Sequence, residues 1–266
     1  MGFLREMVAA TTAAVSQPEY LESLPRRPAR PPASLRSAVR EAAPSGAVLA
    51  EYKRRSPGAS TPELPPRTIA AFLERTTVPE VVAYSCLASG PRFGGAPQDV
   101  ADLAARTPKP VLFKDFVVDP LQITAAARAG ASAILLIARL EVEGLLPVPL
   151  HELADRAHRE GLEVLLEWHG RAELRRTEDV PADVFGVNVR DLDTLELRRP
   201  VAEETLRAAG AFRPMVGMSG VEGPKEARRF WDLGVDGILV GGALARTHDP
   251  SGFLSQLRRP PRETAR

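Results

Sequence analysis

The chain has 266 residues, a usual length for a single α/β barrel or for two smaller domains. Hydrophobic residues make up 44% of it, which is enough for a large core and excludes a wholly disordered chain. The formal net charge is +1 and the basic residues are scattered, so the composition excludes a strongly basic surface for nucleic acid.

Residues 1–33 are expected to form an N-terminal extension that ends in a proline-rich linker. The extension begins with the weakly amphipathic segment MGFLREMVAATTAAV, which is faintly similar to a signal peptide. Glu6 interrupts the apolar part, and no small-residue cleavage site follows, so we expect a surface helix instead. The linker LPRRPARPPA can be neither regular helix nor strand.

Eight short apolar runs follow, separated by longer amphipathic stretches. The runs are rich in Val, Ile and Leu and are nearly continuous, as in strands that are buried on both faces of a parallel sheet. They cover residues 47–53, 81–87, 110–116, 132–138, 162–168, 184–189, 213–219 and 236–242.

The stretches between the runs carry helix signals. Asp119 and Pro120 precede LQITAAARAG, which ends in Gly130, and GPKEARRFWDLG starts a helix at Pro224 and stops it at Gly234. Other helices are expected over 66–76, 98–106, 149–160, 170–177 and 202–210. Eight βα units in succession predict an α/β protein with a closed, eight-stranded parallel β/α (TIM) barrel over residues 34–258 and a C-terminal tail over 259–266. The alternative is a doubly wound open sheet.

The single cysteine, Cys86, excludes an intramolecular disulfide and suits a reducing compartment. No apolar run approaches the roughly 20 residues of a transmembrane helix. We therefore expect a cytoplasmic protein that binds neither membrane nor nucleic acid.

Polar residues at the ends of the runs are candidates for catalysis, because catalytic groups in such barrels lie at the C-terminal ends of the strands. The candidates are Glu51, Lys53, Lys114, Glu167, Asn188 and Arg190. They include two of the four lysines and the only asparagine of the chain. Each alone could make a local hydrogen bond or salt bridge, but together they predict an active site. A second cation and a desolvated pocket are expected to lower the pKa of Lys114.

The last two runs end in the small pairs Ser219-Gly220 and Gly241-Gly242. Such pairs let backbone N–H groups approach a phosphate, helped by the helix that follows. Glycine pairs also occur in ordinary turns. Both pairs in the usual phosphate position of a barrel predict a phosphorylated small-molecule substrate.

Successive motifs resemble those of the indole-3-glycerol phosphate synthase family. They are AEYKRRSP (50–57), RFGG (92–95), LFKDFVVDPLQI (112–123), ASAILLIARL (131–140), LEVLLEWH (162–169), FGVNVRDLDTLEL (185–197), MSGV (218–221) and ILVGGAL (238–244). The resemblance implies a carboxy-lyase of tryptophan biosynthesis. Its substrate would be 1-(2-carboxyphenylamino)-1-deoxyribulose 5-phosphate, and ring closure with loss of carbon dioxide and water would give indole-3-glycerol phosphate. No metal or organic cofactor is implied.

The resemblance also implies catalytic roles. Lys114 would be the general acid that protonates the ribulose carbonyl, although this role in the family has also involved the lysine that matches Lys53. Glu167, supported by Glu51, would assist the loss of the hydroxyl as water and of the proton on the ring nitrogen. Asn188 would contact the substrate's hydroxyls.

The remaining residues would bind the substrate. Arg190 would hold the hydroxyls and the anthranilate carboxylate together with Asn188. Lys53 and Ser56 would contact the carboxylate or the phosphate. The resemblance also implies an apolar wall for the aromatic ring, formed by Phe93, Phe116 and Leu135. The phosphate would be held by the backbone N–H groups of Ser219, Gly220, Gly241 and Gly242.

The chain departs from the family's pattern in a few places. Met218 stands where the family carries a glutamate, and the stretch 87–90 lacks a polar contact. Trp168 and Val189 replace smaller or polar residues beside two active-site positions, and Gly58 and Ala59 alter the loop after Ser56-Pro57. Together these departures predict a pocket with a more apolar rim.

Three alternatives therefore stay open. One is a divergent paralogue that performs the same chemistry on a modified anthranilate-derived substrate. The others are a different phosphate-binding barrel enzyme, such as an isomerase or aldolase, and a non-catalytic barrel that acts as a binding partner. We expect a monomer or weak homodimer that can associate with other tryptophan-pathway enzymes.

Overall fold

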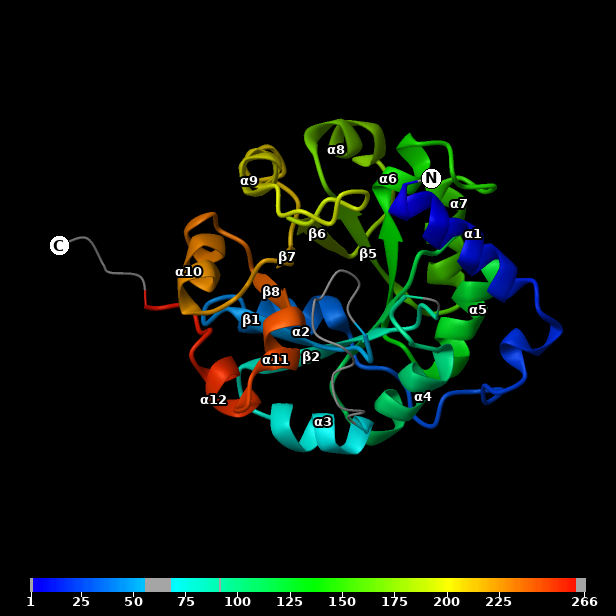
Figure 1. Cartoon of the computed structure of the whole chain (residues 1–266), viewed down its shortest axis with the longest axis horizontal. Helices are drawn as coiled ribbons and strands as arrows, with labels where there is room; N and C mark the ends of the chain where they lie inside the picture. Colours follow the sequence, from blue (N-terminus) through cyan, green and yellow to red (C-terminus); the bar gives the residue numbers. More distant parts are fainter. Residues whose placement is uncertain (1, 56–67, 91, 262–266) are drawn as a thin grey trace.

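The structure, a computed structural model, describes residues 2–55, 68–90 and 92–261. Eight parallel strands form a closed barrel in chain order, which confirms the predicted fold (Figure 1). The open-sheet alternative is wrong because the first strand pairs with the last, with Ala47 opposite Gly237. The strands are β1 (Ala47–Tyr52), β2 (Val81–Leu87), β3 (Val111–Lys114), β4 (Ala133–Ile137), β5 (Glu163–Trp168), β6 (Val184–Asn188), β7 (Met215–Met218) and β8 (Gly237–Val240).

The strands read as continuous apolar runs because both of their faces are buried. In β1, Leu49 belongs to the apolar cluster inside the barrel, whereas Val48 and Ala50 pack in the layer between the barrel and the surrounding helices. Side chains alternate between the two faces of a strand. This alternation directs Glu51 inward at the C-terminal end of β1.

All seven helices expected between the apolar runs form, with ends displaced by up to a few residues. They are α3 (Ile69–Thr76), α4 (Pro97–Arg106), α5 (Pro120–Ala129), α7 (Leu150–Arg159), α8 (Arg171–Thr177), α9 (Arg199–Ala208) and α10 (Pro224–Asp232). The start signals act as expected in α5, where the side chain of Asp119 accepts the N–H of Leu121 and Gly130 ends the helix at φ 77°.

Five further helices in the described ranges were not expected, and all but α2 (Leu35–Ala42) have six residues or fewer, too few turns for a clear apolar periodicity. The other four are η1 (Pro18–Leu21), α6 (Ala138–Val142), α11 (Gly242–Arg246) and α12 (Pro250–Ser255). Within the described ranges, no helix is long and apolar enough to cross a membrane.

The N-terminal extension links the two ends of the barrel. Its first helix, α1 (Phe3–Val15), forms as expected, but it is not simply a surface helix because Leu4 and Met7 are fully buried. The linker passes α4 and α5, where Arg30 donates a hydrogen bond to the carbonyl of Ala105 at 2.8 Å. Ser34 then caps α2 and donates to Glu163 at the start of β5. The domain limits at residues 33 and 258 stay a prediction.

Candidate active site

The candidate residues that the structure describes all line one cavity of about 250 Å³ at the C-terminal ends of the strands. Ser56 is the exception, since it lies outside the described residues, as do Gly58 and Ala59. The catalytic roles assigned to these residues stay predictions. The candidates in the cavity wall are Glu51, Lys53, Phe93, Lys114, Phe116, Leu135, Glu167, Asn188, Arg190, Ser219, Gly220, Gly241 and Gly242.

Glu51 lies between two lysines. Its Oε1 accepts a hydrogen bond from Lys53 Nζ at 2.8 Å, and its Oε2 is 3.5 Å from Lys114 Nζ. Burial alone would raise the pKa of Glu51, but the two ammonium groups outweigh it and lower this pKa to about 2. A side chain at Gly241 would overlap Glu51, because a Cβ there would lie 2.2 Å from Oε1. Gly241 therefore makes room for the carboxylate.

The pKa of Lys114 is raised, so the expectation of a lowered value is wrong. Burial does lower the pKa of this ammonium, but the negative charges of Glu51 and Glu167 raise it by more. The second cation, Lys53, is itself paired with Glu51. Lys114 is therefore fully protonated at neutral pH.

Glu167 is buried, and its two oxygens differ in their surroundings. Oε1 lies 3.1 Å from Nε2 of His169, whereas Oε2 has no hydrogen-bond partner in the described part of the chain. Burial raises the pKa of Glu167, but His169, Lys114 and Asn188 together outweigh it, so the pKa lies below its ordinary value. This carboxylate is ionised at neutral pH.

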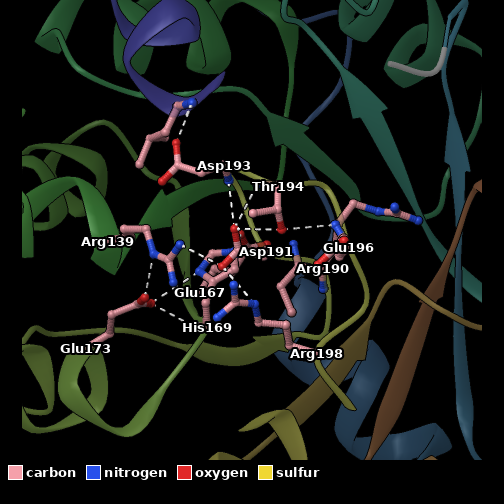
Figure 2. Close-up of polar contacts among 12 residues, drawn as sticks. Arg139, Glu167, His169, Glu173, Arg190, Asp191, Asp193, Thr194, Glu196 and Arg198 are labelled. Carbon is pink, nitrogen blue, oxygen red and sulfur yellow. Dashed lines mark hydrogen bonds and ion pairs between the residues drawn. The ribbon is translucent and has the colours of Figure 1, made fainter. Parts of the chain in front are cut away.

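A set of charged residues behind Glu167 was missed from the sequence. We call His169, Glu173, Arg139 and Asp191 the Glu167 support network (Figure 2). His169 Nδ1 is 3.2 Å from Glu173 Oε2, Arg139 Nε is 2.9 Å from Glu173 Oε1, and Arg139 Nη1 is 3.3 Å from Asp191 Oδ2. The sequence did contain a signal for part of this network. His169 directly follows β5 and Glu173 lies four residues later, and this spacing places both side chains close to Glu167.

Asn188 and Arg190 are held by the loop that follows β6. Asn188 Oδ1 accepts the backbone N–H of Arg190 at 3.0 Å, and the Arg190 guanidinium donates to the carbonyl of Leu195. Leu195 itself has φ 60°, an unusual conformation for a residue with a Cβ. The loop thus presents the guanidinium to the cavity through a strained turn.

The two glycine-containing pairs lie at one end of the cavity. Ser219 and Gly220 have φ values of 66° and 71°, and the left-handed conformation is rare for serine. Arg246, on α11, lines the same cavity and forms an ion pair with Glu222. Arg246 was not predicted as a site residue. Arginine is so abundant in this chain that its presence after the last apolar run does not by itself indicate a binding role.

Three phenylalanines form an apolar wall. The ring centroids of Phe3, Phe93 and Phe116 are each 6.4 Å from the next. Phe3 was missed because it lies on α1, far from the barrel in the sequence. The N–H of Leu4, beside it, lies 3.4 Å from Oδ1 of Asp193 in the loop after β6.

Trp168 and Val189 do not line the cavity, so their expected part in a more apolar rim is wrong. Trp168 stacks on Phe185 in the outer layer, and its Nε1 donates to Thr177 Oγ1 at 2.9 Å. Val189 is buried in the same layer. Each residue directly follows an inward-facing one, and the alternation of a strand turns it outward. Met218 does line the cavity.

The fold and the cavity define a β/α-barrel enzyme whose mouth carries paired lysines and carboxylates. In the described ranges, no group of three His, Cys, Asp or Glu side chains is arranged to hold a metal ion. The sequence model of one family, indole-3-glycerol phosphate synthase, matches residues 4–257. The chain belongs to the indole-3-glycerol phosphate synthase family.

Curated relatives agree with this assignment. Indole-3-glycerol phosphate synthase 2 of Streptomyces coelicolor is 40% identical over 86% of this chain and 86% of its own length. Indole-3-glycerol phosphate synthase of Staphylococcus aureus strain JH1 is 36% identical over 82% of each chain. The expected activity, that of a carboxy-lyase of tryptophan biosynthesis, is confirmed.

Two solved structures match the fold alone. One is 3-hexulose-6-phosphate synthase from Salmonella typhimurium, with a TM-score of 0.58 and 16% identity over 79% of this chain and 96% of that one. The other is thiamine phosphate pyrophosphorylase from Pyrococcus furiosus, with a TM-score of 0.56 and 16% identity over 84% of this chain and 96% of that one.

Proposed function

We propose that the cavity binds 1-(2-carboxyphenylamino)-1-deoxyribulose 5-phosphate and converts it into indole-3-glycerol phosphate, carbon dioxide and water. Lys114 is the general acid and Glu167 the general base. One observation carries the proposal: a protonated lysine and an ionised carboxylate line the same cavity, and each shifts the pKa of the other. Proton donation and proton removal can therefore follow one another without movement of the substrate.

Ring closure comes first. The aromatic carbon that bears the carboxylate attacks the ribulose carbonyl carbon, and the carbonyl oxygen takes a proton from Lys114. The alkoxide that develops is a far stronger base than an amine, so this transfer is favourable even from an ammonium whose pKa is raised. Glu51 holds the ammonium in place.

Decarboxylation and dehydration follow. Loss of carbon dioxide returns its electron pair to the ring and restores aromaticity. The new hydroxyl then takes a proton from Lys53 and leaves as water, while Glu167 removes the proton on the ring nitrogen. A proton from the neighbouring ring carbon finally moves to the nitrogen, which gives the indole.

The other candidates position the substrate. The backbone N–H groups of the two glycine-containing pairs hold the phosphate, with Lys53 as a cation nearby. Asn188 and Arg190 hold the hydroxyls and the anthranilate carboxylate, and the phenylalanine wall and Leu135 face the aromatic ring. Ser56 is proposed as a further contact of the carboxylate or the phosphate.

A direct assay tests the proposal. The purified protein is incubated with 1-(2-carboxyphenylamino)-1-deoxyribulose 5-phosphate, and the formation of indole is followed by its fluorescence. We expect catalytic turnover. The absence of product at high enzyme concentration would overturn the proposed substrate.

Met218 supports a second candidate, a paralogue that acts on a modified anthranilate-derived substrate. Its side chain is 1% exposed and lines the cavity at the position where the family carries a glutamate. An apolar residue here suits an apolar aryl substituent, because no buried polar group is left without a partner.

The variant Met218→Glu decides between the two candidates. Under the main proposal the site already suits the unsubstituted substrate, so kcat/KM should not increase. A buried carboxylate without a partner should also destabilise the fold by about 1–3 kcal/mol, measured by thermal unfolding. A gain in kcat/KM of about tenfold or more, roughly 1.4 kcal/mol of transition-state stabilisation, would favour the paralogue.

The proposal extends to the setting of the enzyme. The protein is cytoplasmic, a monomer or weak homodimer, and able to associate with other enzymes of tryptophan synthesis. The buried thiol of Cys86 supports the reducing compartment. Sedimentation at increasing concentration measures the oligomeric state.

A further inference from the structure

His169 is enclosed between two carboxylates. Its side chain is 2% exposed, with Nε2 3.1 Å from Glu167 Oε1 and Nδ1 3.2 Å from Glu173 Oε2. The contact with Glu173 is a hydrogen bond, and the same oxygen also accepts the backbone N–H of His169 at 2.6 Å. The contact with Glu167 is an ion pair in which the N–H does not point well at the oxygen. In enzymes without bound substrate such contacts are often poorly aligned and tighten in the complex.

The contacts continue away from Glu167. Arg139 on α6 bridges Glu173 and Asp191. Asp191 Oδ1 accepts the backbone N–H groups of Asp193 and Thr194, each at 3.0 Å, and so fixes the loop that begins at Arg190. Figure 2 shows this line of contacts from β5 to the loop after β6. The Glu167 support network therefore joins the proposed base to the loop that carries a proposed substrate contact.

The charges around His169 favour its protonated form. Glu167 on β5 and Glu173 on α8 face the ring directly, and Lys114 on β3 and Arg139 on α6 lie beyond these carboxylates. Burial lowers the pKa of His169, but the two carboxylates outweigh it and raise this pKa to about 9. A ring with one carboxylate at each nitrogen thus carries a positive charge at neutral pH.

We propose that His169 is a positioning residue for Glu167, a buried imidazolium that holds Oε1 and leaves Oε2 to take the proton from the substrate. This inference rests on the proposed role of Glu167 as the base. Oε2 is buried and has no hydrogen-bond partner among the described residues, so it is the oxygen available to the substrate. A neutral side chain of similar size would fill the same space but would not supply the charge that fixes Glu167.

The protonation state of His169 can be measured without any activity. The chain has four histidines, so ¹⁵N spectra of the imidazole nitrogens are simple to interpret, and His169→Gln identifies the signals of this ring. We expect both nitrogens to be protonated at pH 7.5. A neutral ring at that pH would overturn the inference, whether or not the proposed substrate is correct.

The kinetics of His169→Gln test the positioning role. We expect the single-turnover rate to fall about 100-fold, as for a misplacement of about 1 Å, with KM changed less than threefold. The acidic limb of the pH–rate profile should move to higher pH, because Glu167 has lost a cation that lowers its pKa. A fall in rate with an unmoved acidic limb would indicate a merely structural role and contradict the proposal.

Two further variants complete the design. His158→Gln is the matched control, because His158 pairs with Asp183 on the surface and should leave rate and pH profile unchanged. Glu173→Gln keeps the shape of the site but removes one of the two carboxylates, so His169 should lose its proton at a lower pH in the ¹⁵N spectra. If His169→Gln does not fold, Glu173→Gln still tests the positioning role of His169. An unchanged titration of His169 in this variant would refute the proposal.

Discussion

At the mouth of the barrel, a single carboxylate contacts both lysines of the proposed site. Glu51 forms a hydrogen bond with Lys53 and an ion pair with Lys114. Glu51 thereby lies between the two partly buried lysines and contacts both of their ammonium groups. The acid of the reaction is held in its protonated form by its neighbours, and the developing alkoxide of the substrate supplies the driving force for proton transfer.

The variant Lys114→Ala tests the acid at the residue scale. We expect kcat to fall by about 10²–10⁴-fold, the usual contribution of a general acid, while substrate binding weakens much less. Single-turnover kinetics and equilibrium titration measure the two effects separately. Lys225→Ala, which removes an exposed lysine from α10, serves as the control and should behave as wild type. Turnover close to wild type in Lys114→Ala would remove Lys114 from the acid role.

At the scale of elements, the loop between β3 and α5 contains residues of the motif LFKDFVVDPLQI that stabilise the loop and do not contact the substrate in the proposed mechanism. Gln122 accepts the N–H groups of Val118 and Asp119 through Oε1 and donates from Nε2 to Asp115 Oδ2 at 2.9 Å. Asp115 in turn accepts the N–H of Phe116 at 2.9 Å. Several residues of the stretch LFKDFVVDPLQI thus fix the position from which Lys114 and Phe116 face the cavity.

Helix α1 is the element whose role the sequence left open. Phe3 lines the cavity, its ring meets Phe93 and Phe116 edge to face, and Arg92 forms an ion pair with Glu6. The ion pair is exposed and contributes little free energy. The aromatic contacts and the buried Leu4 and Met7 hold α1 over the mouth.

We expect Phe3→Ala to raise KM by about tenfold, because the aromatic ring of the substrate loses part of an apolar contact worth roughly 1–2 kcal/mol. The rate at saturating substrate should change less than threefold, since Phe3 supplies no proton. Steady-state kinetics with the proposed substrate measure both. Phe253→Ala on α12, away from the cavity and also partly buried, is the matched control. Equal KM values for the two variants would show that α1 makes no contact with the substrate.

At the scale of the whole molecule, the buried charges connect the site to the stability of the fold. The pKa of Glu51 is lowered to about 2 in the folded chain, below the ordinary value of 4.5. A lowered carboxyl pKa contributes stability that is complete above the unfolded value and is lost as the pH falls through the folded value. Glu51 should therefore stabilise the barrel at neutral pH and cease to do so in acid.

Comparison of wild type with Glu51→Gln measures this contribution. We expect wild type to be more stable by on the order of 3 kcal/mol above pH 4.5, which is the free-energy equivalent of this pKa shift. The difference should shrink as the pH falls from 4.5 to about 2. Denaturant unfolding at a series of pH values gives both free energies. A difference that does not depend on pH would show that the carboxylate charge of Glu51 is not what stabilises the fold.

The barrel itself could be predicted from the sequence, because the pattern that indicates each strand lies within a few consecutive residues. Strands buried on both faces must be apolar throughout, and each of the eight strands lies within one of the eight predicted runs. The ends of the same runs identified Glu51, Lys114, Glu167 and Asn188 as candidate groups, and in a closed parallel barrel the ends of all strands meet at one mouth.

Other features could be learned only from the tertiary structure, because they depend on distances between residues that are far apart in the chain. The direction of the pKa shift of Lys114, the place of Phe3 over the mouth, and the outward orientation of Trp168 all follow from packing between separate elements. The support of Glu167 by His169 and Arg139 is of the same kind. Sequence determined the periodic pattern of strands and helices and which polar residues end the strands. The balance of burial and charge at each group was set only when the closed barrel brought those groups together, because electrostatic interactions depend on separation in space and on exclusion of water.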